Sequence, residues 1–146
     1  MLRPDLPYTG GMKRLQDFTV GDTFEAFREV DSYRPIYYAA ASGDFNPIHI
    51  DPQVGRAAGY SGAILQGMCT FSWLSDACVA YLGDPARLRR IRARFTKPVQ
   101  VGDVIRFQGR CVALDGPRIA LELEATNQRG EEVLKGAVAE GHLGEG

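Results

Sequence analysis

The chain has 146 residues, a length that favours one domain with a hydrophobic core of its own. Its net charge of −1 gives no global field that would recruit nucleic acid or an anionic membrane surface. No apolar run approaches the roughly 20 residues of a membrane span, and the first residues lack the apolar centre of a secretory signal, so we expect a cytoplasmic protein.

Residues 1–16 carry proline and glycine and show no clear period, so we interpret them as an arm before one domain, residues 17–146. Hydrophobic spacing and capping residues then predict one strand followed by three helices. The last of these helices is apolar almost all round, which indicates that it is buried inside the protein. The predicted strand covers Thr23–Val30, and the predicted helices cover Tyr33–Ala41, Pro52–Ala58 and Met68–Leu82.

The rest of the chain changes to a period of two, the period of a β-strand. In the first of these segments Ile91, Ala93 and Phe95 fall on one face and arginines on the other. One early strand, a helical middle and a long antiparallel meander indicate an α+β fold, with the sheet wrapped around the last helix. The predicted strands cover Arg89–Phe95, Asp103–Leu114, Ile119–Thr126 and Glu132–Leu143.

The segment Ser42–Asp51 concentrates polar groups suited to acid–base chemistry, because Asp44, Asn46 and His49 lie within six residues. A glycine and a proline in the segment oppose helix formation, so we expect a stiff, non-helical turn. Such residues often only make turn hydrogen bonds, and a lone histidine is often a satisfied core residue. A carboxylate, an amide and an imidazole held together can instead grip and activate one water.

The segment closely resembles the signature of the MaoC-like (R)-specific enoyl-CoA hydratases, also called type 2 enoyl-CoA hydratases. The resemblance continues through Ala58–Tyr60, Ile64–Thr70 and Ile91–Val99 and covers most of residues 18–143. It implies a single hot-dog fold, a curved antiparallel sheet around a long central helix. It also implies a homodimer.

The resemblance further implies a role for each motif residue. Asp44, Asn46 and His49 would hold a water over C3 of a trans-2-enoyl thioester, with Asp44 and His49 as the acid–base pair. The backbone N–H of Gly67 would bind the thioester oxygen, where the N-terminal dipole of the following helix favours negative charge.

Two positions depart from the family pattern. Gln66 stands where members usually carry histidine before Gly67, and Ala63 stands where a proline is common. The Gln66 amide can still donate a hydrogen bond toward the substrate but holds no proton at pH 7. We therefore expect retained activity with an altered rate or substrate shape.

Arginines recur along the predicted strand Arg89–Phe95, and each one alone is most simply a solvated residue. We hypothesise that Arg92, Arg94 and Lys97 contact the phosphates of coenzyme A, since guanidinium groups suit phosphate geometry.

The sequence as a whole indicates a lyase that reversibly hydrates trans-2-enoyl thioesters of CoA or of acyl-carrier protein to the (R)-3-hydroxyacyl products. No metal or organic cofactor is expected, and three cysteines without a Cys-x-x-Cys pair and only two histidines suggest no zinc site. Two alternatives stay open. One is an acyl-CoA thioesterase of the same fold. The other is a weakly active or non-catalytic subunit paired with a second hot-dog protein, for which Gln66 gives some support.

Overall fold

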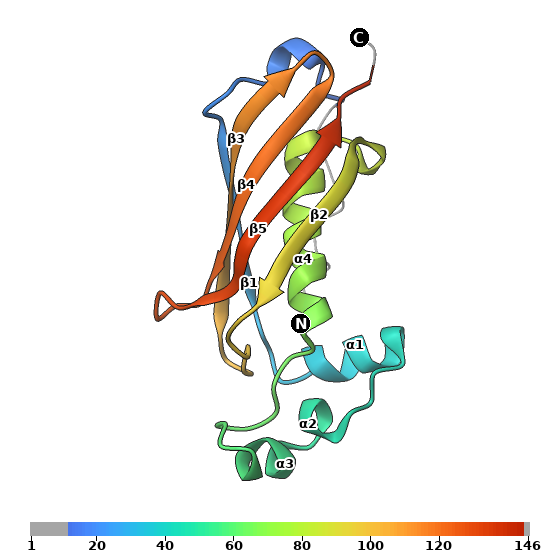
Figure 1. Ribbon diagram of the computed structural model, residues 1–146. Helices are drawn as coiled ribbons and strands as arrows, with labels where there is room; N and C mark the ends of the chain where they lie inside the picture. The colour runs from blue at the N-terminus through green and yellow to red at the C-terminus, as the bar shows by residue number, and fades with distance from the viewer. Residues whose placement is uncertain (1–11, 145–146) are drawn as a thin grey trace.

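The computed structural model describes residues 12–144 and shows a curved five-stranded sheet along one long helix (Figure 1). All pairings are antiparallel and the strand order is β1-β3-β4-β5-β2. The chain therefore leaves the sheet at one edge, forms its helices, and returns at the opposite edge. The predicted α+β architecture is confirmed. The elements are η1 Leu15–Asp17, β1 Thr23–Glu29, α1 Arg34–Ser42, α2 Pro47–Ile50, α3 Pro52–Ala57, α4 Gly67–Leu82, η2 Pro85–Arg87, β2 Leu88–Phe95, β3 Val104–Asp115, β4 Arg118–Thr126 and β5 Glu132–His142.

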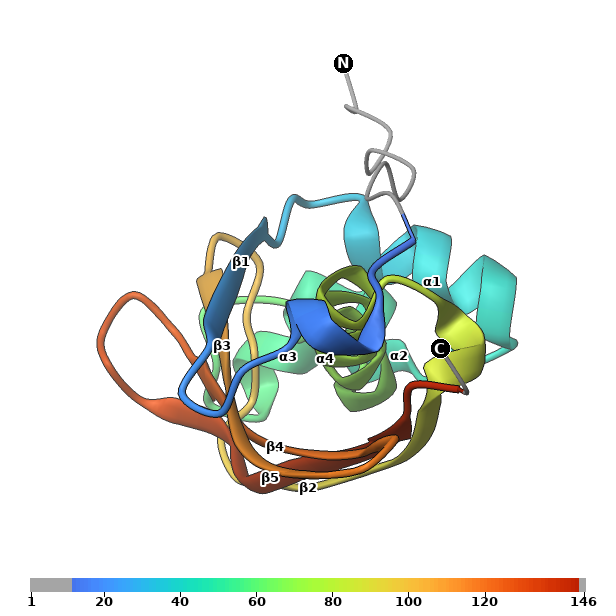
Figure 2. The ribbon, with the colours of Figure 1, turned by 90° about the horizontal axis from the view of Figure 1, so that it is seen from above.

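Helix α4 lies on the concave side of the sheet, as the view from above shows (Figure 2). The apolar residues of β3 and β4 alternate with polar ones, so one face of each strand is buried against this helix. Trp73 of α4 meets Phe107 of β3 edge-on, with ring centroids 6.4 Å apart. One narrow stripe of α4 is exposed to solvent, along Met68, Ser72 and Asp76. The nearly all-round apolar pattern of the helix did not predict this stripe.

Most of the predicted arm, residues 1–11, lies outside the described residues. The remainder contacts the domain. Lys13 donates from Nζ to the carbonyl oxygen of Tyr81 at 2.8 Å, and Arg87 donates to the carbonyl oxygen of Lys13 at 2.6 Å. Residues 13–17 are therefore attached near the C-terminal end of α4.

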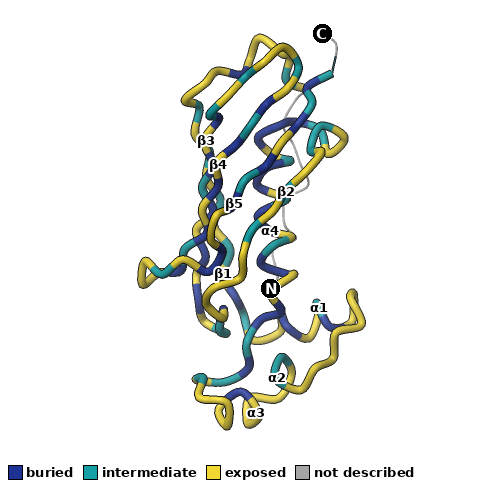
Figure 3. The backbone as a smooth tube through the Cα atoms, in the orientation of Figure 1, coloured by how far each residue is buried: buried dark blue, intermediate teal, exposed yellow. Residues whose placement is uncertain are grey.

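Helices α1, α2 and α3 gather at the N-terminal end of α4 (Figure 1), and α2 and α3 are largely exposed (Figure 3). The prediction of a wholly non-helical turn is wrong for Pro47–Ile50, which form α2. Proline is tolerated at the first helical position because its missing N–H has no partner to lose there. Asn46 caps this turn, its side chain accepting from the Ile48 N–H at 3.1 Å. Among residues 12–144 no helix has both the length and the apolar character to cross a bilayer.

Candidate active site

Asp44 and His49 lie beside each other because one tight loop and one helical turn connect them. Helix α1 ends at Gly43, whose φ of 78° is the left-handed conformation that glycine adopts at low cost. The Oδ1 atom of Asp44 then accepts from the Asn46 N–H at 3.3 Å, and Asn46 in turn caps α2. As a result, Oδ2 of Asp44 lies 3.6 Å from Nε2 of His49.

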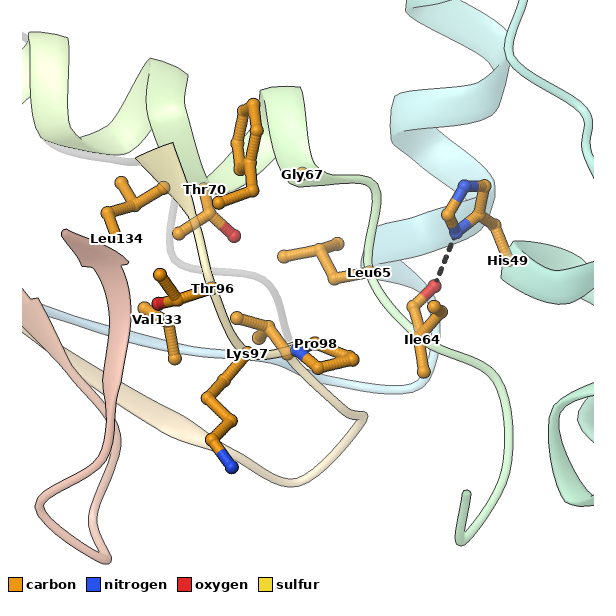
Figure 4. A pocket seen from close by; sticks show the side chains of 12 residues that line it. His49, Ile64, Leu65, Gly67, Thr70, Thr96, Lys97, Pro98, Val133 and Leu134 are labelled. Carbon is orange, nitrogen blue, oxygen red and sulfur yellow. Dashed lines mark hydrogen bonds between the residues drawn. The ribbon is translucent and has the colours of Figure 1, made fainter. Parts of the chain in front are cut away.

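The imidazole of His49 is oriented by the backbone of a distant segment (Figure 4). Its Nδ1 lies 2.8 Å from the carbonyl oxygen of Ile64, and the Ile64 N–H donates to the carbonyl of Ile48 at 3.1 Å. Since a carbonyl oxygen can only accept, Nδ1 carries the hydrogen and Nε2 of the neutral ring keeps a free lone pair. The 3.6 Å gap to Asp44 exceeds a direct hydrogen bond, and one water can contact both atoms across it.

The three motif side chains differ in their access to solvent. The side chain of His49 is 14% exposed, while that of Asp44 is 47% exposed. Asn46 is exposed. Its side-chain oxygen Oδ1 accepts the capping hydrogen bond of α2, so its side-chain nitrogen Nδ2 is the group that remains to bind a ligand. The carboxylate is thus the solvent-facing partner and the imidazole the enclosed one.

Gly67 is the first residue of the 16-residue helix α4, so its N–H is one of four that have no acceptor within the helix. The ring of Phe95 lies over it. A Cβ atom added to Gly67 would come within 3.0 Å of a Phe95 ring carbon. Phe95 was predicted to lie on the same face of its strand as Ile91 and Ala93, and its side chain is 55% exposed at this position. A residue with a side chain at position 67 would displace the ring that borders the amide.

A pocket of about 250 Å³ is lined by both His49 and Gly67 (Figure 4), whereas Asp44 and Asn46 are not among its lining residues. Lys97 also lines it. Arg92 and Arg94 do not line it and lie exposed on β2. The remaining lining residues are Ile64, Leu65, Thr70, Phe95, Thr96, Pro98, Val99, Val133 and Leu134.

Gln66 does not line this pocket. Its side chain is 1% exposed, and Nε2 donates to the carbonyl oxygen of Pro35 at 2.8 Å and contacts that of Asp44 at 3.4 Å. Its Oε1 has no hydrogen-bond partner. Gln66, one of the two departures from the family pattern, therefore joins α1 and the Asp44 loop to the start of α4.

Three groups at the site had no role in the sequence analysis: the Ile64 carbonyl, the Phe95 ring and the Thr70 hydroxyl. A backbone carbonyl carries no residue-specific signal, and Phe95 read as an ordinary strand residue. All three residues lie in segments that match the family, Ile64 and Thr70 in Ile64–Thr70 and Phe95 in Ile91–Val99, but the match assigned none of them a role.

The MaoC like domain family matches residues 19–132. The "Probable enoyl-CoA hydratase 2" of Dictyostelium discoideum is 36% identical over 106 residues, covering 71% of this chain and 35% of that protein. The "Enoyl-CoA hydratase 2, peroxisomal" of Arabidopsis thaliana is 32% identical over 99 residues, covering 66% and 31%. The chain spans about a third or less of the length of the first curated relatives that it matches.

Solved structures agree with this match. The R-hydratase PhaJ1 from Pseudomonas aeruginosa in the unliganded form has a TM-score of 0.82 and 26% identity, covering 90% of this chain and 85% of that chain. The (R)-hydratase from A. caviae involved in PHA biosynthesis has a TM-score of 0.80 and 25% identity, covering 88% and 99%. With its sheet wrapped around α4 and its match over residues 19–132, the chain belongs to the MaoC-like domain family and has the hot-dog fold.

Proposed function

We propose that this chain catalyses the reversible hydration of trans-2-enoyl thioesters to (R)-3-hydroxyacyl thioesters, with the acyl group carried on CoA or on acyl-carrier protein. The observation that carries the proposal is the approach of His49 Nε2 to Asp44 Oδ2 at 3.6 Å, with the other ring nitrogen occupied by the Ile64 carbonyl. Relatives named as enoyl-CoA hydratase 2 and R-hydratase support the same reaction class.

In the hydration direction, the Asp44–His49 pair takes one proton from a water whose oxygen bonds to C3. The pair then returns one proton to C2 as the enolate collapses, so that it ends in its starting protonation state. Dehydration is the same sequence in reverse. Positioned acid–base groups of this kind contribute about 10²–10⁴-fold in rate. The free amide nitrogen of Asn46 suits a hydrogen bond that orients the water.

Addition at C3 places negative charge on the thioester oxygen, and the Gly67 N–H at the start of α4 suits its stabilisation. One such donor is worth about 3–4 kcal/mol. Because the chemistry involves no redox step and the thioester is polarised by backbone groups, the proposal includes no metal or organic cofactor. At the pocket, Lys97 is the cation placed to meet a phosphate of the carrier.

We also propose that the chain forms a homodimer. The strands β1 and β2 are the two edges of the sheet, and open edges need a cover. Large apolar side chains are exposed at the N-cap of α1, on α1 and in the loop after it, at Tyr33, Ile36, Tyr37 and Phe45. Sedimentation of the purified chain tests this: a monomer that gains hydratase activity only with a second hot-dog protein would support the partner-subunit alternative.

The decisive assay follows the loss of the conjugated thioester absorbance of crotonyl-CoA. We expect Asp44→Asn and His49→Ala each to lower kcat by about 10² or more. Asp51→Asn, a matched change at the cap of α3, should keep wild-type activity because asparagine also caps a helix. A wild type no faster than the Asp44→Asn, His49→Ala double variant would refute the proposal for this substrate. A thiol reagent in a parallel reaction would detect the free CoA that a thioesterase releases.

A further inference from the structure

The hydroxyl of Thr70 is buried without a hydrogen-bond partner. The residue is 2% exposed, and no acceptor or donor lies within bonding geometry of its Oγ1. The two serines of the same helix behave differently: Ser72 donates to the Met68 carbonyl at 2.8 Å and Ser75 to the Phe71 carbonyl at 3.2 Å. Thr70 thus makes no bond to the backbone of the preceding turn, the usual solution for a hydroxyl in a helix.

Thr70 also lines the pocket, which Ser72 and Ser75 do not. In Figure 4 its oxygen turns toward the side on which Leu65 lies. Buried polar groups nearly always have a partner, so one that faces a binding pocket without a partner points to a ligand atom. Besides His49, two other lining residues carry side-chain donors. Thr96 already donates to the Glu132 carbonyl at 2.7 Å, and Lys97 is an exposed cation 3.7 Å from Glu131 rather than a buried group without a partner.

The place of Thr70 in α4 indicates which part of a substrate it meets. It follows Gly67 by three residues, which is about 4.5 Å along the axis of a helix. With the thioester oxygen at the Gly67 N–H, as the proposed function has it, Thr70 lies deeper along α4, toward the acyl chain and away from the carrier. The wall beside it is apolar, formed by side chains that include Leu65, Val99 and Leu134.

We propose that Thr70 is a specificity-determining residue that hydrogen-bonds an oxygen on the acyl chain beyond C3. The preferred substrates are then enoyl thioesters whose chain carries a hydroxyl or keto group, within an otherwise apolar pocket. The hydroxyl both donates and accepts, so it serves either group. An unsubstituted acyl chain leaves the Thr70 hydroxyl without a partner. The enzyme therefore discriminates between acyl chains that carry an oxygen and those that do not. This inference rests on the proposed function for the direction in which the substrate lies.

The test compares trans-2-hexenoyl-CoA with analogues that carry a hydroxyl on C4, C5 or C6. We expect the wild type to prefer at least one analogue by about 3- to 10-fold in kcat/KM, the value of one neutral hydrogen bond. Thr70→Val, which keeps the branched shape and removes the oxygen, should abolish the preference, and Thr70→Ser should retain it. Ser72→Ala, a hydroxyl deletion on the same helix outside the pocket, should leave the preference unchanged.

Three results would overturn the assignment. One is an equal preference in wild type and Thr70→Val, as expected if a water or the neighbouring Gln66 Oε1, which also lacks a partner, satisfies the hydroxyl. Another is an equal loss of kcat/KM in Thr70→Val on all substrates. That result would mean that the Thr70 hydroxyl contacts the part of the molecule that all the substrates share. The third is a wild type without any preference.

A wild type that hydrates none of these compounds would refute the proposed function but not this subsite. Titration calorimetry with hexanoyl-CoA and its saturated hydroxy analogues then decides. A preference of about 3- to 10-fold in Kd that Thr70→Val removes supports the subsite, and equal affinities reject it. Thermal unfolding gives an independent check, since removing a partnerless hydroxyl should leave Tm unchanged or raised.

Discussion

Replacing Gln66 by leucine tests whether one buried amide holds the parts of the site together. Its Nε2 donates to the Pro35 carbonyl at 2.8 Å and contacts the Asp44 carbonyl at 3.4 Å. Leucine has a similar volume but no donor, so both carbonyls lose this contact while the walls of the pocket stay. We expect the loop that carries Asp44 to shift relative to Gly67.

The expected effects of Gln66→Leu on the free energy of unfolding and on kcat differ in size. The free energy of unfolding should fall by about 1 kcal/mol, the value of one well-formed hydrogen bond. The 3.4 Å contact adds little to this, and the variant also removes the buried Oε1 that has no partner. Activity should suffer more, because a shift of about 1 Å in a catalytic group costs up to about 10²-fold. We therefore expect kcat to fall about 10- to 100-fold with little change in KM.

Gln66→Glu gives a second readout, because it keeps the shape and replaces the donating amide with a carboxyl. Burial beside two carbonyl oxygens favours the protonated form, so the pKa of the introduced group should rise above its ordinary value. A raised folded-state pKa means that stability is lost as pH rises from the unfolded pKa through the folded one. The kcat of this variant relative to wild type should fall over the same range, while the ratio for Gln66→Leu stays flat.

The assay is crotonyl-CoA hydration across the pH range in which the wild type stays folded, with thermal unfolding at each pH. Gln53→Leu is the matched control, since Gln53 lies exposed on α3. The reasoning would be refuted if Gln66→Leu had the same kcat as the wild type. It would also be refuted if the kcat of Gln66→Glu relative to wild type did not change with pH. Either result would show that the amide does not position the acid–base pair.

Three further predictions concern other parts of the chain. Gly67→Ala should lower kcat/KM far more than Tm, because its methyl group would come within 3.0 Å of the Phe95 ring and force that ring to shift beside the Gly67 N–H; a second change, Phe95→Leu, should restore part of the activity. Burial raises the pKa of Asp103, but hydrogen bonds led by that from Arg129 outweigh it and hold the pKa below its ordinary value. Asp103→Asn should therefore cost about 1.5–3 kcal/mol in urea unfolding at neutral pH, and the difference from wild type should shrink as pH falls through the lowered pKa. All three cysteines are buried and burial raises the pKa of Cys78 to about 12, so a thiol reagent should label none of them until the chain unfolds.

Local rules in the sequence were sufficient for the five strands and for α1, α3 and α4, but not for the short helix α2. Alternating residues of period two predicted β3 and β4 to within a residue at most ends, and the apolar run Met68–Leu82 predicted α4 from its second residue on. Capping side chains such as Asp51 act within two or three residues of their own position, so they are visible in the sequence itself. The same locality explains why Asp44, Asn46 and His49 were recognised together.

Tertiary structure decided everything at the site that depends on residues distant in the chain. The tautomer of His49 follows from a carbonyl 15 residues away, and the role of Gln66 follows from a carbonyl 31 residues away. Neither acceptor has a sequence signature, since every residue carries a carbonyl group. Whether a polar side chain is satisfied is also a property of its surroundings, which is why Thr70 was seen as a ligand-binding candidate only after α4 had been packed against the sheet.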